Sequence, residues 1–124
     1  MNDRCILLGK QPQEYLPSIY QTSDLFLLAS DYEIYGMVIL EAMYFGLPVI
    51  STLTAGSETL IESYENGVIL DNKNEAEWKQ VIMAVTNDKS LLSMMKEKST
   101  IKVKNELIWD KACERFIQLY FSVK

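Results

Sequence analysis

The 124-residue chain contains no histidine, which excludes a Ser-His-Asp or Cys-His catalytic group within it. The same absence excludes a histidine general base and any histidine metal ligand. The chain has two cysteines, Cys5 and Cys113, and their wide separation suits neither a metal site nor a redox pair. Both stand among apolar residues, so we expect two buried thiols in a reducing compartment.

The chain also lacks a basic block and a long apolar run. Its net charge is -5 with acids and bases interspersed, so nucleic-acid binding, which depends on clustered Lys and Arg, is not expected. It has no signal-peptide pattern and no apolar run long enough to span a bilayer. We therefore expect a cytoplasmic protein. The lysine-rich run 96–104 favours a solvated helix face, with peripheral contact to anionic lipid at the inner membrane face as the alternative.

Four short, continuously apolar runs predict β-strands at residues 5–8, 25–28, 49–52 and 68–70. Continuous apolar strands are typical of parallel sheets that are covered on both faces. Helical segments are expected between them, at residues 13–21, 36–45 and 57–63. The alternation of strand and helix predicts a doubly wound α/β fold with a parallel sheet.

After residue 71 the pattern becomes helical, and three helices at residues 74–86, 89–104 and 109–121 are expected to cover the sheet. We therefore divide the chain into an α/β core, 1–72, and a helical cover, 73–124. The first predicted strand begins almost at residue 1, whereas doubly wound domains usually have strands and a phosphate-binding loop before such a point. We expect the chain to be the C-terminal part of a larger protein.

One loop stands where a ligand would bind, because ligands of open α/β sheets lie beyond the carboxyl ends of strands. This loop follows the strand at 25–28 and contains Glu33, Ile34, Tyr35 and Gly36. The amides at the start of the next helix are free to bind an anion or a sugar oxygen, and they belong to Gly36, Met37 and Val38. The alternative is that Glu33 simply caps an ordinary buried helix.

Glu41 is the only charged residue between Ile34 and Ile50. It lies about 7–8 Å along the helix axis from Gly36, and its side chain can reach back toward the same loop. A carboxylate at such depth needs hydrogen-bond donors, and a vicinal diol such as that of ribose is a suitable pair. The alternative is a structural glutamate whose partners are backbone amides, Arg4, Lys10 or Arg115.

The two glutamates and their surroundings closely resemble retaining glycosyltransferases of the GT-B fold, family 4 (group 1). That family typically has a Glu, seven residues and a second Glu within E-x-F-G…E-A-M-A-x-G-x-P-V-I. The central matches are Asp24, Ser30, Glu33, Gly36, Glu41, Ala42, Met43, Gly46, Pro48 and Val49. Further matches are Leu8-Gly9, Gly56, Glu58, Asn66-Gly67 and Trp109, so the resemblance covers nearly the whole chain.

The resemblance implies a Rossmann-like nucleotide-sugar-binding domain that transfers a hexose, with retention and without a metal, to a saccharide or lipid-linked acceptor. Glu33 would contact the donor sugar and Glu41 would hold the ribose hydroxyls. The backbone amides of Tyr35, Gly36 and Met37 would hold diphosphate and sugar oxygens. Gly56 and, more weakly, Glu58 would border the same cleft.

Three features depart from the family pattern. Tyr35 replaces the usual Phe, and the loop at 55–58 reads Ala-Gly-Ser-Glu, which puts the role of Glu58 in doubt. The basic pair that neutralises the diphosphate, and the N-terminal acceptor domain, are absent from this chain. Lys10 follows the first predicted strand. It either contacts the nucleotide or is a solvated loop lysine.

Two other readings stay open at this point. The chain could be a non-catalytic nucleotide-binding or assembly module that keeps the fold, or a purely structural α/β domain. In the enzyme reading, the chain supplies donor binding and is inactive without the missing N-terminal part.

Overall fold

The computed structural model of the protein describes residues 5–32, 36–71 and 73–104. The predicted donor-sugar contact Glu33, its neighbours Ile34 and Tyr35, Cys113 and the helix expected at 109–121 lie outside the described residues.

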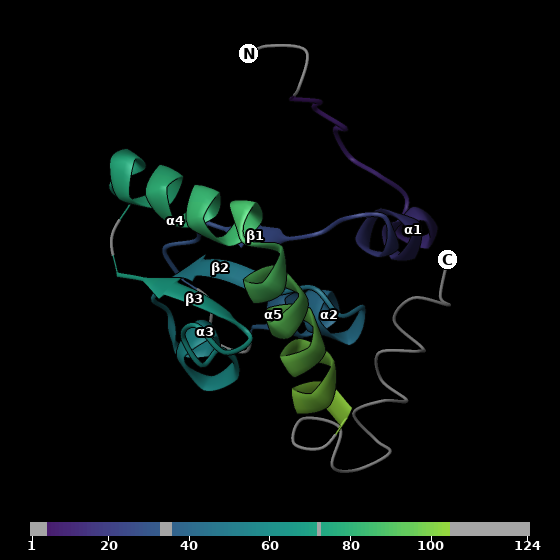
Figure 1. Ribbon diagram of the computed structural model, residues 1–124. Helices are drawn as coiled ribbons and strands as arrows, with labels where there is room; N and C mark the ends of the chain where they lie inside the picture. The colour runs from purple at the N-terminus through teal and green to yellow at the C-terminus, as the bar shows by residue number, and fades with distance from the viewer. Residues whose placement is uncertain (1–4, 33–35, 72, 105–124) are drawn as a thin grey trace.

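The described residues form a three-stranded parallel sheet in the order β1-β2-β3 (Figure 1). The strands are β1 (Phe26–Leu28), β2 (Val49–Thr52) and β3 (Gly67–Leu70). In the register, Phe26 lies opposite Val49, which in turn lies opposite Gly67. The prediction for β2 is confirmed at both ends, and β1 and β3 each differ from their predicted ranges by one residue at the start.

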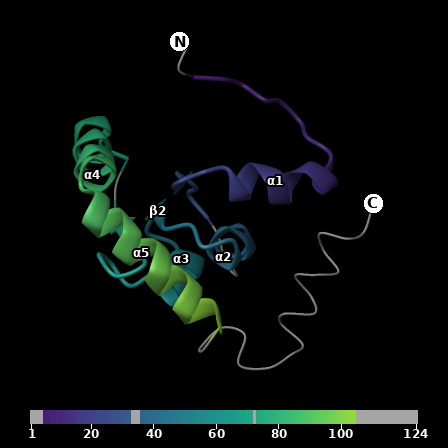
Figure 2. The ribbon, with the colours of Figure 1, turned by 45° about the vertical axis from the view of Figure 1, so that its right-hand side comes forward.

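Helices connect the strands and cover the sheet on both faces. The first part of the chain contains η1 (Gln13–Tyr15), α1 (Leu16–Gln21), α2 (Met37–Tyr44) and α3 (Ala55–Leu60). After β3 come α4 (Glu75–Asn87) and α5 (Lys89–Lys102). Figure 1 shows α4 on one side of the sheet and α3 on the other, while Figure 2 shows α5 crossing beside α2 and α3. The predicted α/β fold with a doubly covered parallel sheet is confirmed.

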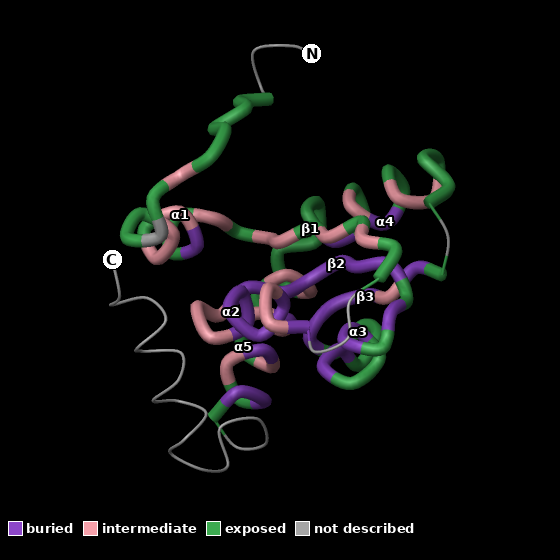
Figure 3. The backbone as a smooth tube through the Cα atoms, turned by 180° about the vertical axis from the view of Figure 1, so that it is seen from behind, coloured by how far each residue is buried: buried purple, intermediate pink, exposed green. Residues whose placement is uncertain are grey.

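The two apolar cores follow from the alternation of side chains along β2, because successive residues of a strand point to opposite faces. Val49 packs in one core with Ile39 and Met43 of α2. Ile50, the next residue, packs in the other with Val85 of α4 and with residues of α5. Both β2 residues are fully buried, which explains why the strand is continuously apolar in sequence (Figure 3).

The prediction of a strand at residues 5–8 is wrong. This segment has no strand conformation, and it runs from α1 away from the sheet (Figures 1 and 2). Ile6 and Leu7 expose 78% and 82% of their surface, and the Cys5 thiol is exposed rather than buried. A strand needs a neighbouring strand for its backbone groups, and this segment pairs with none of the described strands.

The prediction for α3 is displaced. The helix was expected from Ser57, but it begins at Ala55 with Thr54 as its N-cap. The Ser57 backbone amide donates to Thr54 Oγ1 at 3.1 Å, and the Thr54 amide donates to Ser57 Oγ at 2.9 Å. Ser57 is thus the third residue of a reciprocal capping box and not its first.

The lysines near the end of the described chain are paired with acids from other elements. Lys96 contacts Asp24 at 2.9 Å, Lys98 contacts Glu65, and Lys102 lies 3.9 Å from Glu62. Lys96 and Lys98 are partly exposed, as a solvated face requires, whereas Lys102 is buried. In the described part of the chain, no helix is long and apolar enough to cross a bilayer.

Candidate functional site

The loops that follow the three strands meet at the carboxyl edge of the sheet. The Thr52 hydroxyl, at the end of β2, donates a hydrogen bond to the Ser30 carbonyl in the loop after β1. Lys73, just beyond β3, pairs with Asp31 of the same β1 loop at 2.6 Å. At the edge where parallel α/β sheets bind ligands, the loop after β1 is therefore bonded both to the end of β2 and to the loop after β3.

Gly36 is the N-cap of α2 and has left-handed backbone angles, with φ of 66° and ψ of 33°. A Cβ at this position would lie 2.8 Å from Leu60 Cδ1 and 3.3 Å from the Cα of Gly56. Both glycines are buried where the start of α2 meets α3. Gly36 was expected to admit a ligand, and the structure adds a second requirement, which is the close approach of α3.

The backbone amides that were predicted from the sequence to bind an anion or a sugar oxygen lie at the start of α2. Met37 and Val38, the first two helical residues, are partly buried, and the Gly36 carbonyl accepts the first helical hydrogen bond from Leu40 at 2.9 Å. Amides of a first helical turn have no partner within the helix and carry the positive end of its dipole. Such a helix start suits a diphosphate or a sugar oxygen.

Glu41 is 4% exposed and lies on α2 between the fully buried residues Ile39 and Met43. The Tyr20 hydroxyl, from α1, donates to Glu41 Oε1 at 3.2 Å in a buried setting. The expectation that Glu41 is buried and hydrogen-bonded is confirmed. Sequence reasoning missed Tyr20 as its partner, because 21 residues separate the two; the available signal was the apolar spacing of Leu16 and Tyr20 on one face of the first helix.

Of the other predicted site residues, one is buried at the contact of α2 with α3 and two are exposed. Gly56 is buried against α2, as described above, whereas Glu58 is exposed on α3. Lys10 is exposed in the segment that runs from α1 away from the sheet. Among the residues that the structure describes, no group of three or more Cys, Asp or Glu is placed to hold a metal ion.

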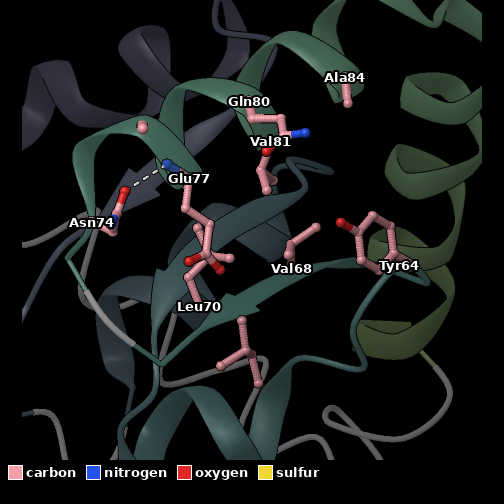
Figure 4. Close-up of a pocket in the computed structure, with 10 residues that line it drawn as sticks. Tyr64, Val68, Leu70, Asn74, Glu77, Gln80, Val81 and Ala84 are labelled. Carbon is pink, nitrogen blue, oxygen red and sulfur yellow. Dashed lines mark hydrogen bonds between the residues drawn. The ribbon is translucent and has the colours of Figure 1, made fainter.

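A separate groove of about 800 Å³ lies between β3 and α4 (Figure 4). Apolar side chains such as Val68 and Val81 line it together with polar ones, and the Glu77 amide donates to Asn74 Oδ1 at 3.0 Å at one end. None of the predicted site residues lines this groove. It is therefore distinct from the loops at the start of α2.

Solved structures share this arrangement of strands and helices. The C-terminal domain of a glycosyl transferase group 1 family protein (LpcC) from Francisella tularensis superposes with a TM-score of 0.73 and 23% identity, over 82% of this chain and 52% of that one. HepE from Anabaena, in complex with UDP and glucose, gives 0.75 and 21% identity, over 98% of this chain and 33% of that one. The fold is that of GT-B glycosyltransferase C-terminal domains.

The family can be stated from the sequence match. The protein-family model described as Glycosyl transferases group 1 matches residues 1–102 of the sequence, and the chain belongs to that family.

Two curated relatives illustrate the range of the family. D-inositol 3-phosphate glycosyltransferase of Salinispora tropica is 26% identical over 120 residues, which are 97% of this chain and 25% of that protein. N-acetyl-alpha-D-glucosaminyl L-malate synthase of Bacillus anthracis is 28% identical over 123 residues, which are 99% of this chain and 32% of that protein. The chain thus spans a quarter to a third of the length of these relatives.

Proposed function

We propose that the chain is the donor-binding part of a retaining family 4 glycosyltransferase, which transfers a hexose from a nucleoside diphosphate sugar to a saccharide or lipid-linked acceptor. Membership of the group 1 family supports the reaction class. The acceptor site belongs, in this proposal, to an N-terminal domain outside this sequence, and transfer requires that domain. We expect the reaction to run in the cytoplasm.

The observation that carries the proposal is the buried carboxylate of Glu41 in the middle of α2. Burial of a carboxylate among apolar side chains costs several kcal/mol unless hydrogen-bond donors surround it. A ribose diol supplies two such donors with suitable geometry for one carboxylate. The positive end of the α2 dipole favours the adjoining diphosphate.

The other roles follow the order of residues along the loop and helix. Glu33 contacts the donor sugar, and the amides of Tyr35, Gly36 and Met37 bind the diphosphate and sugar oxygens. Gly56 borders the cleft through its contact with Gly36. Glu58 and Lys10 are weaker candidates, since both side chains are exposed. The proposed reaction needs no metal ion.

Ligand-observed NMR of this chain against UDP, GDP, ADP and their sugar conjugates, at millimolar ligand, tests the proposal. We expect one nucleotide to bind and Glu41→Gln to weaken its binding on the order of tenfold, because hydrogen bonds to charged groups contribute about 1.5–3 kcal/mol. Glu97→Gln, which changes an exposed carboxylate on α5, is the matched control and should bind as the wild type does.

Binding that is insensitive to Glu41→Gln would contradict the assignment of the ribose to this carboxylate. Transfer is tested after the chain is joined to an upstream acceptor domain. Binding without transfer in that longer protein would favour a non-catalytic nucleotide-binding module, and an inverted product would contradict the retaining mechanism.

A further inference from the structure

Within the described part of the chain, Tyr20 makes two ring contacts and one side-chain hydrogen bond. Its ring stacks on Phe45, with centroids 5.5 Å apart and planes 9° from parallel. It also packs at a tilt of 55° on Phe26 of β1, with centroids 6.0 Å apart. Its hydroxyl donates to Glu41 Oε1. Tyr20 is 8% exposed, so it is largely shielded from solvent.

The direction of the hydroxyl follows from the two contacts on α2. Phe45 follows Glu41 by four residues, which is about one helical turn, and its amide donates to the Glu41 carbonyl at 3.4 Å. The Tyr20 ring lies over Phe45, while its hydroxyl reaches Glu41, one turn nearer the start of the helix. The hydroxyl therefore points along α2 toward the helix start, where the donor would bind.

We propose that Tyr20 is a positioning residue for the Glu41 carboxylate and, through it, a determinant of ribose recognition; this inference rests on the proposed function. A glutamate side chain has several rotatable bonds, and fixing one carboxylate oxygen orients the other. Pre-organisation of this kind lowers the entropy that ligand binding must otherwise overcome. The aromatic contacts with Phe26 and Phe45 supply the rigid support.

The length of the hydrogen bond suits a Tyr20 hydroxyl that orients the Glu41 carboxylate more than one that offsets its charge. The 3.2 Å separation is longer than the ~2.5–2.7 Å of charge-assisted O–H···O⁻ bonds. A carboxylate has about four acceptor positions, so the bond from Tyr20 uses only part of its hydrogen-bonding capacity. Bonds of this kind often tighten when the ligand binds.

The test compares two nucleotides on the same variant. Among UDP, GDP and ADP, the one that binds the wild type is measured beside its 2′,3′-dideoxy analogue, which keeps the base and diphosphate but lacks the diol. We expect the wild type to prefer the ribonucleotide on the order of tenfold. Tyr20→Phe keeps the ring and its stacking but removes the hydroxyl, and should reduce that preference to about threefold or less.

The ratio separates positioning from a merely structural role. If Tyr20→Phe only reduces the folded fraction, both nucleotides weaken equally and their ratio stays at the wild-type value. Tyr44→Phe is the matched control. Tyr44, the last residue of α2, also contacts the Phe45 ring, edge-on and with ring centroids 5.2 Å apart. It should leave the ratio unchanged.

The outcomes distinguish this inference from the function on which it rests. Loss of the preference in both Glu41→Gln and Tyr20→Phe supports the inference. Loss in Glu41→Gln with a wild-type ratio in Tyr20→Phe overturns it and leaves the proposed function standing. Binding of none of the three nucleotides by the wild type overturns the proposed function, and the inference with it.

Discussion

Gly36 and Gly56 meet backbone to backbone, so that a Cβ on Gly36 would lie 3.3 Å from both the Cα and the carbonyl carbon of Gly56. This contact places the start of α2 directly against α3. The two loops that the sequence assigned to one ligand site are therefore brought together by a pair of residues without side chains.

Gly36→Ala should destabilise the protein by about 2–4 kcal/mol, from the left-handed backbone and from overpacking against Leu60 and Gly56. Urea unfolding measures the effect. Gly46→Ala is the matched control at the other end of α2, because Gly46 also has a positive φ of 80°, but among the described residues a Cβ there would meet only the Thr100 hydroxyl, at 3.1 Å. Equal losses in the two variants would show that close packing against α3 contributes nothing.

Ser57→Ala should cost about 1–3 kcal/mol, because it removes the partner of two buried backbone groups. Ser57 Oγ accepts from the Thr54 amide and donates to the Thr52 carbonyl at 2.8 Å. Thermal unfolding checks this, with Thr59→Ala as the comparison on the exposed face of the same helix. A Ser57→Ala protein as stable as the Thr59→Ala protein would rule out a structural role for the capping box.

Asn66→Ala should cost about 2–4 kcal/mol, because two hydrogen bonds of a buried side chain are lost together. Asn66 is 1% exposed; its Oδ1 accepts from the Glu62 amide at 2.8 Å and its Nδ2 donates to the Leu60 carbonyl at 3.0 Å. Chemical denaturation measures the change. Asn87→Ala, at the exposed end of α4, should remain within about 0.5 kcal/mol of the wild type.

The hydrogen bond and charge of Glu65 raise the pKa of Lys98 above its ordinary value of 10.5. Because the folded-state pKa is raised, the pair's contribution is fully present below the unfolded pKa and is lost as pH rises through the folded pKa. The melting temperature of Lys98→Gln should therefore fall below that of the wild type at pH 8. The difference should vanish above the folded pKa of Lys98, in strongly alkaline solution.

Glu65→Gln provides the reciprocal check on this pair. It should lower the melting temperature to a similar small extent at pH 8, since both side chains are nearly half exposed and their attraction is screened by solvent. In the Lys98→Gln background, Glu65→Gln should add nothing further. A full additional loss in the double variant would mean that the two side chains act independently.

The sheet could be predicted because its strands carry their own signal. Val49 and Ile50 point to opposite cores, so a strand covered on both faces has an unbroken apolar sequence. The segment at residues 5–8 carries the same signal and is not a strand, since an apolar sequence does not provide the neighbouring backbone that a strand requires.

The site could be predicted less completely. The burial of Glu41 follows from its apolar neighbours along one helix, which are local in sequence. Its partner Tyr20 depends on how α1 lies against α2; the spacing of Leu16 and Tyr20 marks a buried face of the first helix but does not say which residue that face meets. Likewise, the glycine at position 36 is visible in the sequence, whereas its contact with Gly56 is a property of the folded chain.

The two outer edges of the sheet, β1 and β3, differ in how their backbone groups are hydrogen-bonded. Along β3, the preceding turn folds back so that the Tyr64 amide donates to the Gly67 carbonyl at 2.6 Å and Ser63 Oγ accepts from the Ile69 amide at 3.0 Å. Within the described residues, β1 has a strand on one side only. Because the turn already bonds two backbone groups of β3, a further strand would find more open backbone groups along β1 than along β3.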